Sequence, residues 1–261
     1  MRIVPHPDWS PLDDALQRAA DKGCAIAFWW RDDDAVAHTP ALDRLLALAA
    51  GLRVPLVLAP IPARVEPSLA ARLSDEPWVG VTVHGLRHTN HAPPGKAKTE
   101  FGPNRSLDTL KADADAGLRA AQARFGVRLN PIFVPPWNRI APALAAALPA
   151  LGYCGLSGFG ERAAREVTAG LIQVNTHLDP IAWRGDRSLT DPDALVAKLV
   201  RSIDSRLSGA AYPEPIGVLT HHLAHDEAVW TFCEALLERL VAQPVARFPS
   251  IDAVFSIEAR A

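Results

Sequence analysis

Short continuous apolar runs alternate along the chain with segments that carry apolar side chains at helical spacing. The apolar runs are typical of strands covered on both faces of a parallel sheet. The segments between them begin at Pro or end at Gly, which are common helix limits. We expect strands at 24–30, 54–59, 78–83, 131–134, 153–157, 170–175 and 216–220, and helices at 11–21, 39–51, 67–74, 106–125, 141–151, 191–207 and 226–241.

A strand followed by a helix, repeated about seven times with short connections, is typical of right-handed βαβ units. Both an open doubly wound sheet and a closed barrel fit this order. No glycine-rich turn follows the first strand, where a dinucleotide-binding fold needs one. Clusters of polar residues instead follow five of the expected strands. Functional side chains at the ends of several strands are typical of a barrel. The sequence therefore predicts an α/β barrel that spans residues 1–261 as one domain.

Composition and charge narrow the classes of partner. The formal net charge is −2, and Lys and Arg are scattered without any run, so we expect neither a nucleic-acid nor a membrane partner. No segment approaches the roughly 20 apolar residues of a membrane span, and no signal peptide is apparent, so we expect a cytoplasmic protein. Cys24, Cys154 and Cys233 are odd in number and widely spaced, which indicates reduced thiols.

Two histidines four residues apart, His84 and His88, directly follow the third expected strand. Neutral imidazole is a common ligand of divalent transition metals, but a stable centre needs a third protein ligand. The acidic triplet Asp32, Asp33 and Asp34, which ends the first strand, offers one. Adjacent carboxylates repel one another unless a cation binds or they spread into solvent. Taken alone, the triplet also fits a solvated turn that caps the next helix.

Further polar residues follow the later strands. They are Pro135, Pro136, Trp137, Asn138 and Arg139 after the fourth strand, His177 and Asp179 after the sixth, and His221 and His222 after the seventh. Together with the triplet and the paired histidines, their order resembles the polysaccharide deacetylase family (the NodB homology domain, of carbohydrate esterase type). The resemblance covers residues 25–222, marks the chain as a divergent member, and implies a distorted (β/α)7 barrel.

In that family the first of two adjacent aspartates acts as general base and the second as metal ligand. The resemblance implies Asp33 as base and Asp34 as ligand, and the other register makes Asp32 the base and Asp33 the ligand. The family's His-x-x-x-His motif matches His84 and His88 without a gap, and the resemblance implies that they are the other two metal ligands.

The third motif, Arg-x-Pro-Tyr or similar, departs from the family at two positions. Val134 stands where the family has an arginine that orients the base, and Arg31 or Arg139 would have to take over that role. Trp137 replaces the tyrosine, but its backbone N–H would still stabilise an oxyanion. The fifth motif implies that His221 is the general acid. The oxyanion and substrate-binding residues implied by the third motif are Pro136, Trp137, Asn138 and Arg139.

The segment from 89 to 105 has no periodicity and predicts a long loop after the paired histidines, a length that is often functional. His91, in this loop, is either a third imidazole near the metal or a solvent-exposed or substrate-facing residue, and Glu100 either lines a substrate groove or belongs to an ordinary loop. We expect His177 and Asp179 at the active face without an assigned role. Asp179 and Trp183 form a degenerate version of the family's fourth motif.

The resemblance implies a metal-dependent hydrolase that removes an acetyl group from an N-acetylated sugar or a related small amide. The substrate would be a small molecule or a soluble glycan. Two histidines and a carboxylate suit zinc first, and cobalt, manganese or nickel as alternatives. Two other functions stay open: hydrolysis of a non-carbohydrate C–N bond, and a catalytically silent barrel that binds a glycan or a metal.

Overall fold

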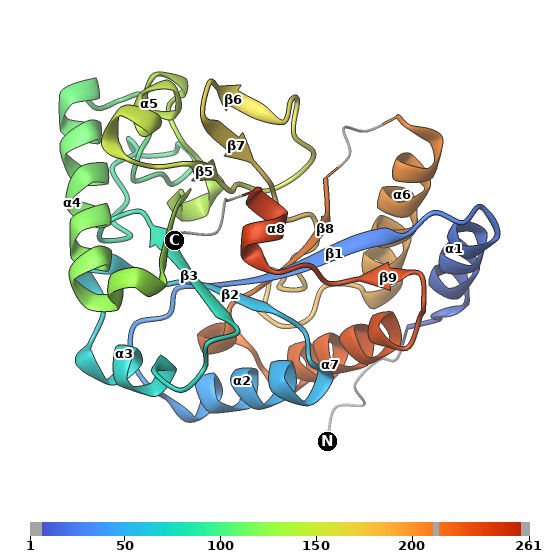
Figure 1. Ribbon diagram of the computed structural model, residues 1–261. Helices are drawn as coiled ribbons and strands as arrows, with labels where there is room; N and C mark the ends of the chain where they lie inside the picture. The colour runs from blue at the N-terminus through green and yellow to red at the C-terminus, as the bar shows by residue number, and fades with distance from the viewer. Residues whose placement is uncertain (1–6, 211–213, 257–261) are drawn as a thin grey trace.

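A sheet of parallel strands forms the centre of the computed structural model, which describes residues 7–210 and 214–256 (Figure 1). Its strands lie in the order β7, β5, β4, β3, β2, β1, β8. Their bounds are β1 (Ile26–Asp33), β2 (Leu56–Ala59), β3 (Val79–His84), β4 (Leu129–Val134), β5 (Gly155–Leu156), β7 (Leu171–Gln173) and β8 (Ile216–Thr220). A parallel bridge between Leu178 and Val218 joins the segment after β7 to β8. The sheet therefore curls into a distorted barrel, as predicted.

Two further strands extend this sheet. The short β6 (Glu166–Thr168) pairs antiparallel with β7, and β9 (Ala246–Arg247) pairs parallel with the start of β1. The sequence predicted neither of them.

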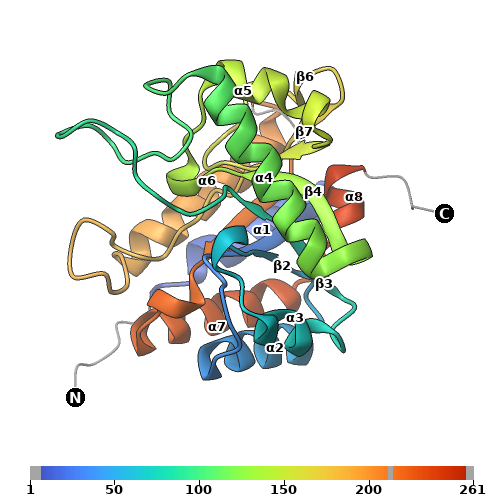
Figure 2. The ribbon, with the colours of Figure 1, turned by 90° about the vertical axis from the view of Figure 1, so that its left-hand side faces the viewer.

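Helices surround the sheet, with α4 on one side and α1 and α6 on the other in Figure 1. Their bounds are α1 (Ser10–Asp21), α2 (Pro40–Leu52), α3 (Pro67–Leu73), α4 (Leu107–Phe125), α5 (Pro142–Ala147), α6 (Pro192–Ser208), α7 (Glu227–Val241) and α8 (Ile251–Phe255). Figure 2, turned by 90°, shows α4 running across the barrel and α2, α3 and α7 gathered below it. No helix of the described residues combines the length and apolar character needed to cross a lipid bilayer.

Side chains at the helix N-termini explain where several helices begin. Thr39 accepts a hydrogen bond from the N–H of Leu42 at the start of α2, and Ser106 accepts one from Thr109 at the start of α4. In α1, by contrast, Ser10 is already the first helical residue, and the N-cap is Trp9, which makes no side-chain capping hydrogen bond.

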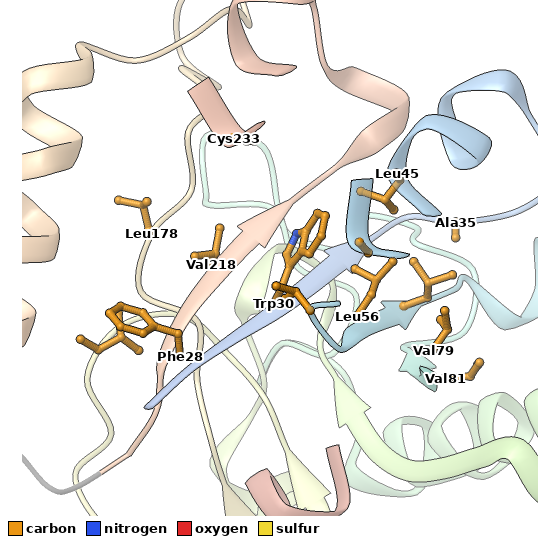
Figure 3. Packing of buried hydrophobic residues seen from close by; sticks show 14 of the residues in the cluster. Phe28, Trp30, Ala35, Leu45, Leu56, Val79, Val81, Leu178, Val218 and Cys233 are labelled. Atoms are coloured by element: carbon orange, nitrogen blue, oxygen red, sulfur yellow. The ribbon is translucent and has the colours of Figure 1, made fainter. Parts of the chain in front are cut away.

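Alternation along β1 divides its side chains between two layers. Trp30 faces the apolar layer between sheet and helices, where Figure 3 shows it among Phe28, Leu45, Leu56 and Val218. Trp29 belongs to a separate apolar cluster inside the barrel. The same alternation continues through Asp32 and Asp33 at the end of β1, so their side chains point to opposite faces of the sheet.

The C-terminal helix α8 fills the end of the barrel at which the strands begin. The sequence did not predict this helix. Gly155, the first residue of β5, leaves room for it, because a Cβ there would lie 2.9 Å from the Phe255 ring. The barrel-interior cluster consists of Trp29, Val57, Ile132, Val174, Ile251, Val254 and Phe255. With that end filled, the opposite end of the strands is where polar groups meet.

Candidate active site

Three side chains of the types that bind metals meet at the carboxyl ends of β1 and β3. Asp34 directly follows β1, His84 ends β3, and His88 lies in the loop after it. The Asp34 Oδ1 atom lies 3.2 Å from His84 Nε2 and 3.4 Å from His88 Nε2. The three ligand atoms all lie within 4.8 Å of one another. The structure thus brings together the three residues predicted as metal ligands.

The backbone at Asp34 explains how its carboxylate reaches the histidines. Continued alternation along β1 would turn Asp34 to the outer layer, on the same side as Asp32. Instead, Asp34 adopts a left-handed conformation with φ 72°, which ends the strand. Aspartate tolerates this region better than most residues other than glycine.

The hydrogen bonds around the three residues fit a divalent cation. His84 Nδ1 lies 3.0 Å from the Val134 carbonyl oxygen. Because a carbonyl only accepts, Nδ1 carries the proton and Nε2 presents a lone pair toward Asp34. Asp34 Oδ1 is buried, and no described residue donates a hydrogen bond to it. A buried carboxylate oxygen without a donor, beside imidazole nitrogens, matches the donor set of a zinc-type site.

The pKa shifts of these residues reflect burial and their mutual charges. Burial raises the pKa of Asp34, but His84, His88 and His221 outweigh it and hold that pKa below its ordinary value. Burial, together with the charge of His84, lowers the pKa of His88. Burial also lowers the pKa of His84, but Asp33 and Asp34 outweigh it and raise that pKa. Because a metal would bind the lone pair of His84 Nε2, metal binding and protonation of that nitrogen exclude one another.

A buried ion pair, Arg31 with Asp33, faces the barrel interior. Arg31 Nε lies 2.8 Å from Asp33 Oδ1, and Arg31 Nη2 lies 3.0 Å from Asp33 Oδ2. The two side chains are 0% and 2% exposed, and the pairing is bidentate. Arg31 also donates to the carbonyl and hydroxyl oxygens of Ser157 and to Asn138 Oδ1. These bonds fix the plane of the guanidinium and, through it, that of the Asp33 carboxylate.

The turn η3 (Pro136–Asn138) follows β4 and carries the third motif. Trp137 has a left-handed φ of 54°, and its ring centroid lies 4.2 Å from that of His88. No hydrogen bond joins the Trp137 N–H to another described residue. Arg139 donates to the carbonyl oxygens of Lys98 and Trp137. Of the two arginines considered for the missing position, Arg31 is therefore the one that contacts Asp33.

Asp32 lies on the opposite face of β1 and is fully buried. Its Oδ2 accepts from the Thr220 hydroxyl and from the His222 N–H, and its Oδ1 lies 2.5 Å from His222 Nδ1. Burial raises the pKa of Asp32, but His222 outweighs it and lowers that pKa. Burial lowers the pKa of His222, but Asp32 outweighs it and raises that pKa. This pair ties β1 to the turn that follows β8.

His221 follows β8 and lies on the same side of the barrel as the three metal-ligand residues. Its ring meets the Trp183 ring edge-on, with the centroids 4.7 Å apart. Its charge is close enough to lower the pKa of both Asp34 and Asp179. Burial nevertheless raises the pKa of Asp179, whose carboxylate accepts from Trp183 Nε1 at 2.7 Å. The degenerate fourth motif thus lies against His221.

His177 does not lie at this site. Its Nδ1 accepts the N–H of Gly217 near the start of β8, whereas His221 follows the end of that strand. The expectation that His177 faces the site is therefore wrong. With Glu161 and Glu214 it forms a second group of ligand-type residues. His177 Nε2 lies 3.2 Å from Glu214 Oε1 and 3.1 Å from Arg206 Nη2, and Arg206 also pairs with Glu161, so the members of this group already have partners.

Glu100 is a buried residue whose position the sequence did not reveal. Its carboxylate accepts the N–H groups of Leu86, Arg87 and His88, directly behind the metal-ligand residues. An acidic residue in a loop without periodicity carries no signal of such contacts. His91, in the same loop, is exposed, and its N–H donates to the Thr99 carbonyl oxygen.

No family model and no curated protein matches this sequence. Solved structures do match. A protein from Mycobacterium smegmatis described as a polysaccharide deacetylase has a TM-score of 0.66 at 14% identity, with 90% of each chain covered. A family 4 acetyl xylan esterase from Clostridium thermocellum, solved with a cobalt ion, has a TM-score of 0.56 at 14% identity, covering 88% of this chain and 91% of that one.

A mutant of a CE4 family pseudoenzyme with restored activity has a TM-score of 0.57 at 14% identity, covering 89% of this chain and 68% of that one. At such low identity these similarities concern the fold. The chain has the fold of the polysaccharide deacetylases, as its motifs predicted.

Proposed function

We propose that this chain, which has the fold of the polysaccharide deacetylases, is a divergent member of that family and a metal-dependent hydrolase. It would remove an acetyl group from an N-acetylated sugar or a related small amide. One observation carries the proposal: a buried Asp34 oxygen, to which no described residue donates a hydrogen bond, lies 3.2 Å and 3.4 Å from two imidazole nitrogens. A carboxylate and a histidine suited to acid–base chemistry, Asp33 and His221, lie beside it.

Asp34, His84 and His88 would hold the metal. Zinc suits this donor set first, with cobalt, manganese and nickel as alternatives. The acetyl xylan esterase with the same fold was solved with a cobalt ion. A divalent metal, when bound, supplies Lewis acidity that activates a water molecule and polarises an acyl carbonyl.

Asp33 is the proposed general base. It faces the barrel interior, and its charge is close enough to His84 to raise the pKa of that residue. The bidentate pair with Arg31 holds its carboxylate in one orientation, which favours transfer of a proton from a positioned water. The alternative base, Asp32, has both oxygens occupied by Thr220 and His222 on the other face of β1, which supports the Asp33 register.

His221 is the proposed general acid, which protonates the leaving amine. The Trp183 ring packs against its imidazole, and its backbone N–H donates to His225 Nε2, so both ring and backbone are held. The Trp137 N–H, without a partner among the described residues, is available to donate to an oxyanion. Asn138 accepts a hydrogen bond from Arg31, and Arg139, which is exposed, would contact substrate outside the barrel.

The substrate class and setting are part of the proposal. We expect a soluble glycan or small molecule, and neither nucleic acid nor membrane. The cytoplasmic location and the single domain expected from the sequence stay predictions.

Elemental analysis of protein purified without added metal, paired with acetate release from a panel of N-acetylated sugars, tests the proposal. One equivalent of metal together with acetate release is the expected result. Metal without acetate release on any substrate would favour the other C–N hydrolase or a silent barrel, and a pseudoenzyme does occur among the similar structures. A protein that takes up no metal even after dialysis against zinc would overturn the proposal.

A further inference from the structure

The loop that carries His88 is closed around a buried carboxylate. Glu100 Oε1 accepts from the Arg87 N–H at 2.8 Å, and Oε2 accepts from the N–H groups of Leu86 and His88, each at 3.2 Å. Three consecutive backbone amides that converge on one anion form the kind of concave site known as a nest. Glu100 is 1% exposed, and among the described residues no basic side chain forms an ion pair with it. Its hydrogen bonds are therefore directed to this loop.

The loop adopts a conformation that depends on this closure. Gly85 and His88 both have a left-handed φ of 57°. A Cβ at Gly85 would lie 2.5 Å from Glu100 Oε2 and 2.6 Å from the Pro136 ring, so only glycine fits between them. His88 is neither glycine nor one of the smallest residues, and its left-handed backbone is unfavourable without compensation. The hydrogen bond from its N–H to Glu100 supplies that compensation.

Glu100 is itself fixed from the side of α4. Arg105 Nη1 donates to the Glu100 carbonyl oxygen at 3.0 Å, and Arg105 Nη2 pairs with Asp113 on α4 at 2.6 Å. The same helix supports the loop directly, since a Cβ at Gly117 would clash with the Gly85 carbonyl oxygen. The backbone of Glu100 is thus tied to α4 through Arg105, while its carboxylate holds the loop that carries His88.

We propose that Glu100 is a positioning residue for His88, holding its backbone so that the imidazole faces Asp34. His84 needs no such support, because it belongs to β3 and donates to the Val134 carbonyl oxygen. Without Glu100, three amides lose their acceptor, and the loop must rearrange to pair them elsewhere. The inference rests on the proposed function, since it takes Asp34, His84 and His88 as metal ligands.

Cobalt(II) binding to metal-free full-length protein tests this role, measured by competition with a chelator and by the visible absorption of the bound ion. Glu100→Gln keeps the size of the side chain but places an NH₂ group against N–H donors. We expect it to weaken cobalt affinity about 10- to 100-fold, the range found for groups that orient metal ligands, and to change the visible spectrum. Glu100→Asp keeps the charge on a shorter side chain and should give an intermediate loss.

Glu214→Gln is the matched control. Glu214 is also a buried carboxylate that accepts backbone N–H groups, those of Arg162 and Asn175, but it precedes β8 at the other end of the strands. Its substitution should leave cobalt affinity and spectrum unchanged. Urea unfolding of the metal-free proteins measures how far each variant is destabilised.

The possible results distinguish a failure of the Glu100 positioning role from a failure of the proposed function. Equal cobalt affinity in wild type and Glu100→Gln would overturn the positioning role and leave the proposed function standing. Equal losses in Glu100→Gln and Glu214→Gln would also overturn it, because the effect would then be general destabilisation. If Glu100→Gln does not fold, Glu100→Asp is judged by the same two criteria. A wild type that binds no cobalt would overturn the proposed function and the inference with it.

Discussion

Asp33→Asn tests the register of the acidic triplet and the role of the buried ion pair. The substitution keeps the shape of the side chain but places an NH₂ group where a carboxylate oxygen now accepts from Arg31. The buried guanidinium then lacks its counter-charge, a change that costs about 3–5 kcal/mol when one member of a buried pair is removed. Arg31 keeps its bonds to Ser157 and Asn138, so we expect a loss near the lower end of that range.

The effect on turnover follows from the proposed role of Asp33 as base. A positioned general base contributes typically about 10²–10⁴ in rate, or about 3–6 kcal/mol at about 1.4 kcal/mol for each factor of ten. We therefore expect kcat for acetate release to fall by about that factor, with metal content unchanged because Asp34, His84 and His88 remain. His84→Ala, in contrast, should lose both metal and turnover.

Asp32→Asn is the matched variant on the opposite face of β1. It breaks the buried pair with His222 and should lower the free energy of unfolding by about 3–5 kcal/mol while the folded protein keeps its metal and most of its activity. Steady-state kinetics, elemental analysis and urea unfolding of both variants give the comparison. If Asp32→Asn instead abolishes turnover and Asp33→Asn strips the metal, the register is wrong by one residue.

Three further substitutions test neighbouring parts of the site. Arg31→Lys keeps the buried charge but cannot form two parallel bonds to Asp33, so kcat should fall while KM stays constant; a rise in KM alone would refute the orienting role. His221→Ala should slow amide cleavage far more than cleavage of an activated ester, whose leaving group needs little protonation, and equal losses would rule out His221 as the acid. Burial lowers the pKa of His225 to about 4, below the value of about 6.5 in the unfolded chain. The unfolded chain therefore binds more protons between these two pH values, and the free energy of unfolding decreases as the pH is lowered through that range. Between pH 7 and pH 5 the wild type should therefore lose about 2 kcal/mol more unfolding free energy than His225→Gln, measured by urea unfolding, and equal pH dependence would contradict the burial argument.

The sequence predicted those parts of the fold whose signals are local. The apolar run at 216–220 became β8 with the same bounds, and Ser106 caps α4 as an expected helix start. The short α8 was missed because one turn and a half gives too little periodicity to detect. Its stability comes from packing against Trp29 inside the barrel, a contact between the two ends of the chain.

In the site, too, the sequence predicted what local signals determine and missed what tertiary contacts determine. Asp34, His84 and His88 could be grouped from the sequence because each follows a strand, and the carboxyl ends of parallel strands meet at one end of a barrel. His177 follows a strand as well, yet its side chain turns to Gly217 and Glu214, since strand order does not fix side-chain direction. The role of Glu100 was not predicted because its contacts with the backbone near His88 depend on how a long loop folds back.

The arginine beside Asp33 shows how a missing motif residue can be replaced from elsewhere in the barrel. The family places the arginine that orients the base after the fourth strand, and Val134 stands there instead. In a barrel, however, one point in the interior can be reached from several strands. Arg31 reaches the proposed base Asp33 from the same strand, two residues earlier, because alternation puts both side chains on the same face. Val134 still contributes through its carbonyl oxygen, which fixes the His84 ring and is independent of the side chain. The loss of a motif residue therefore does not by itself indicate a silent site, because the same contact can be supplied from elsewhere in the barrel.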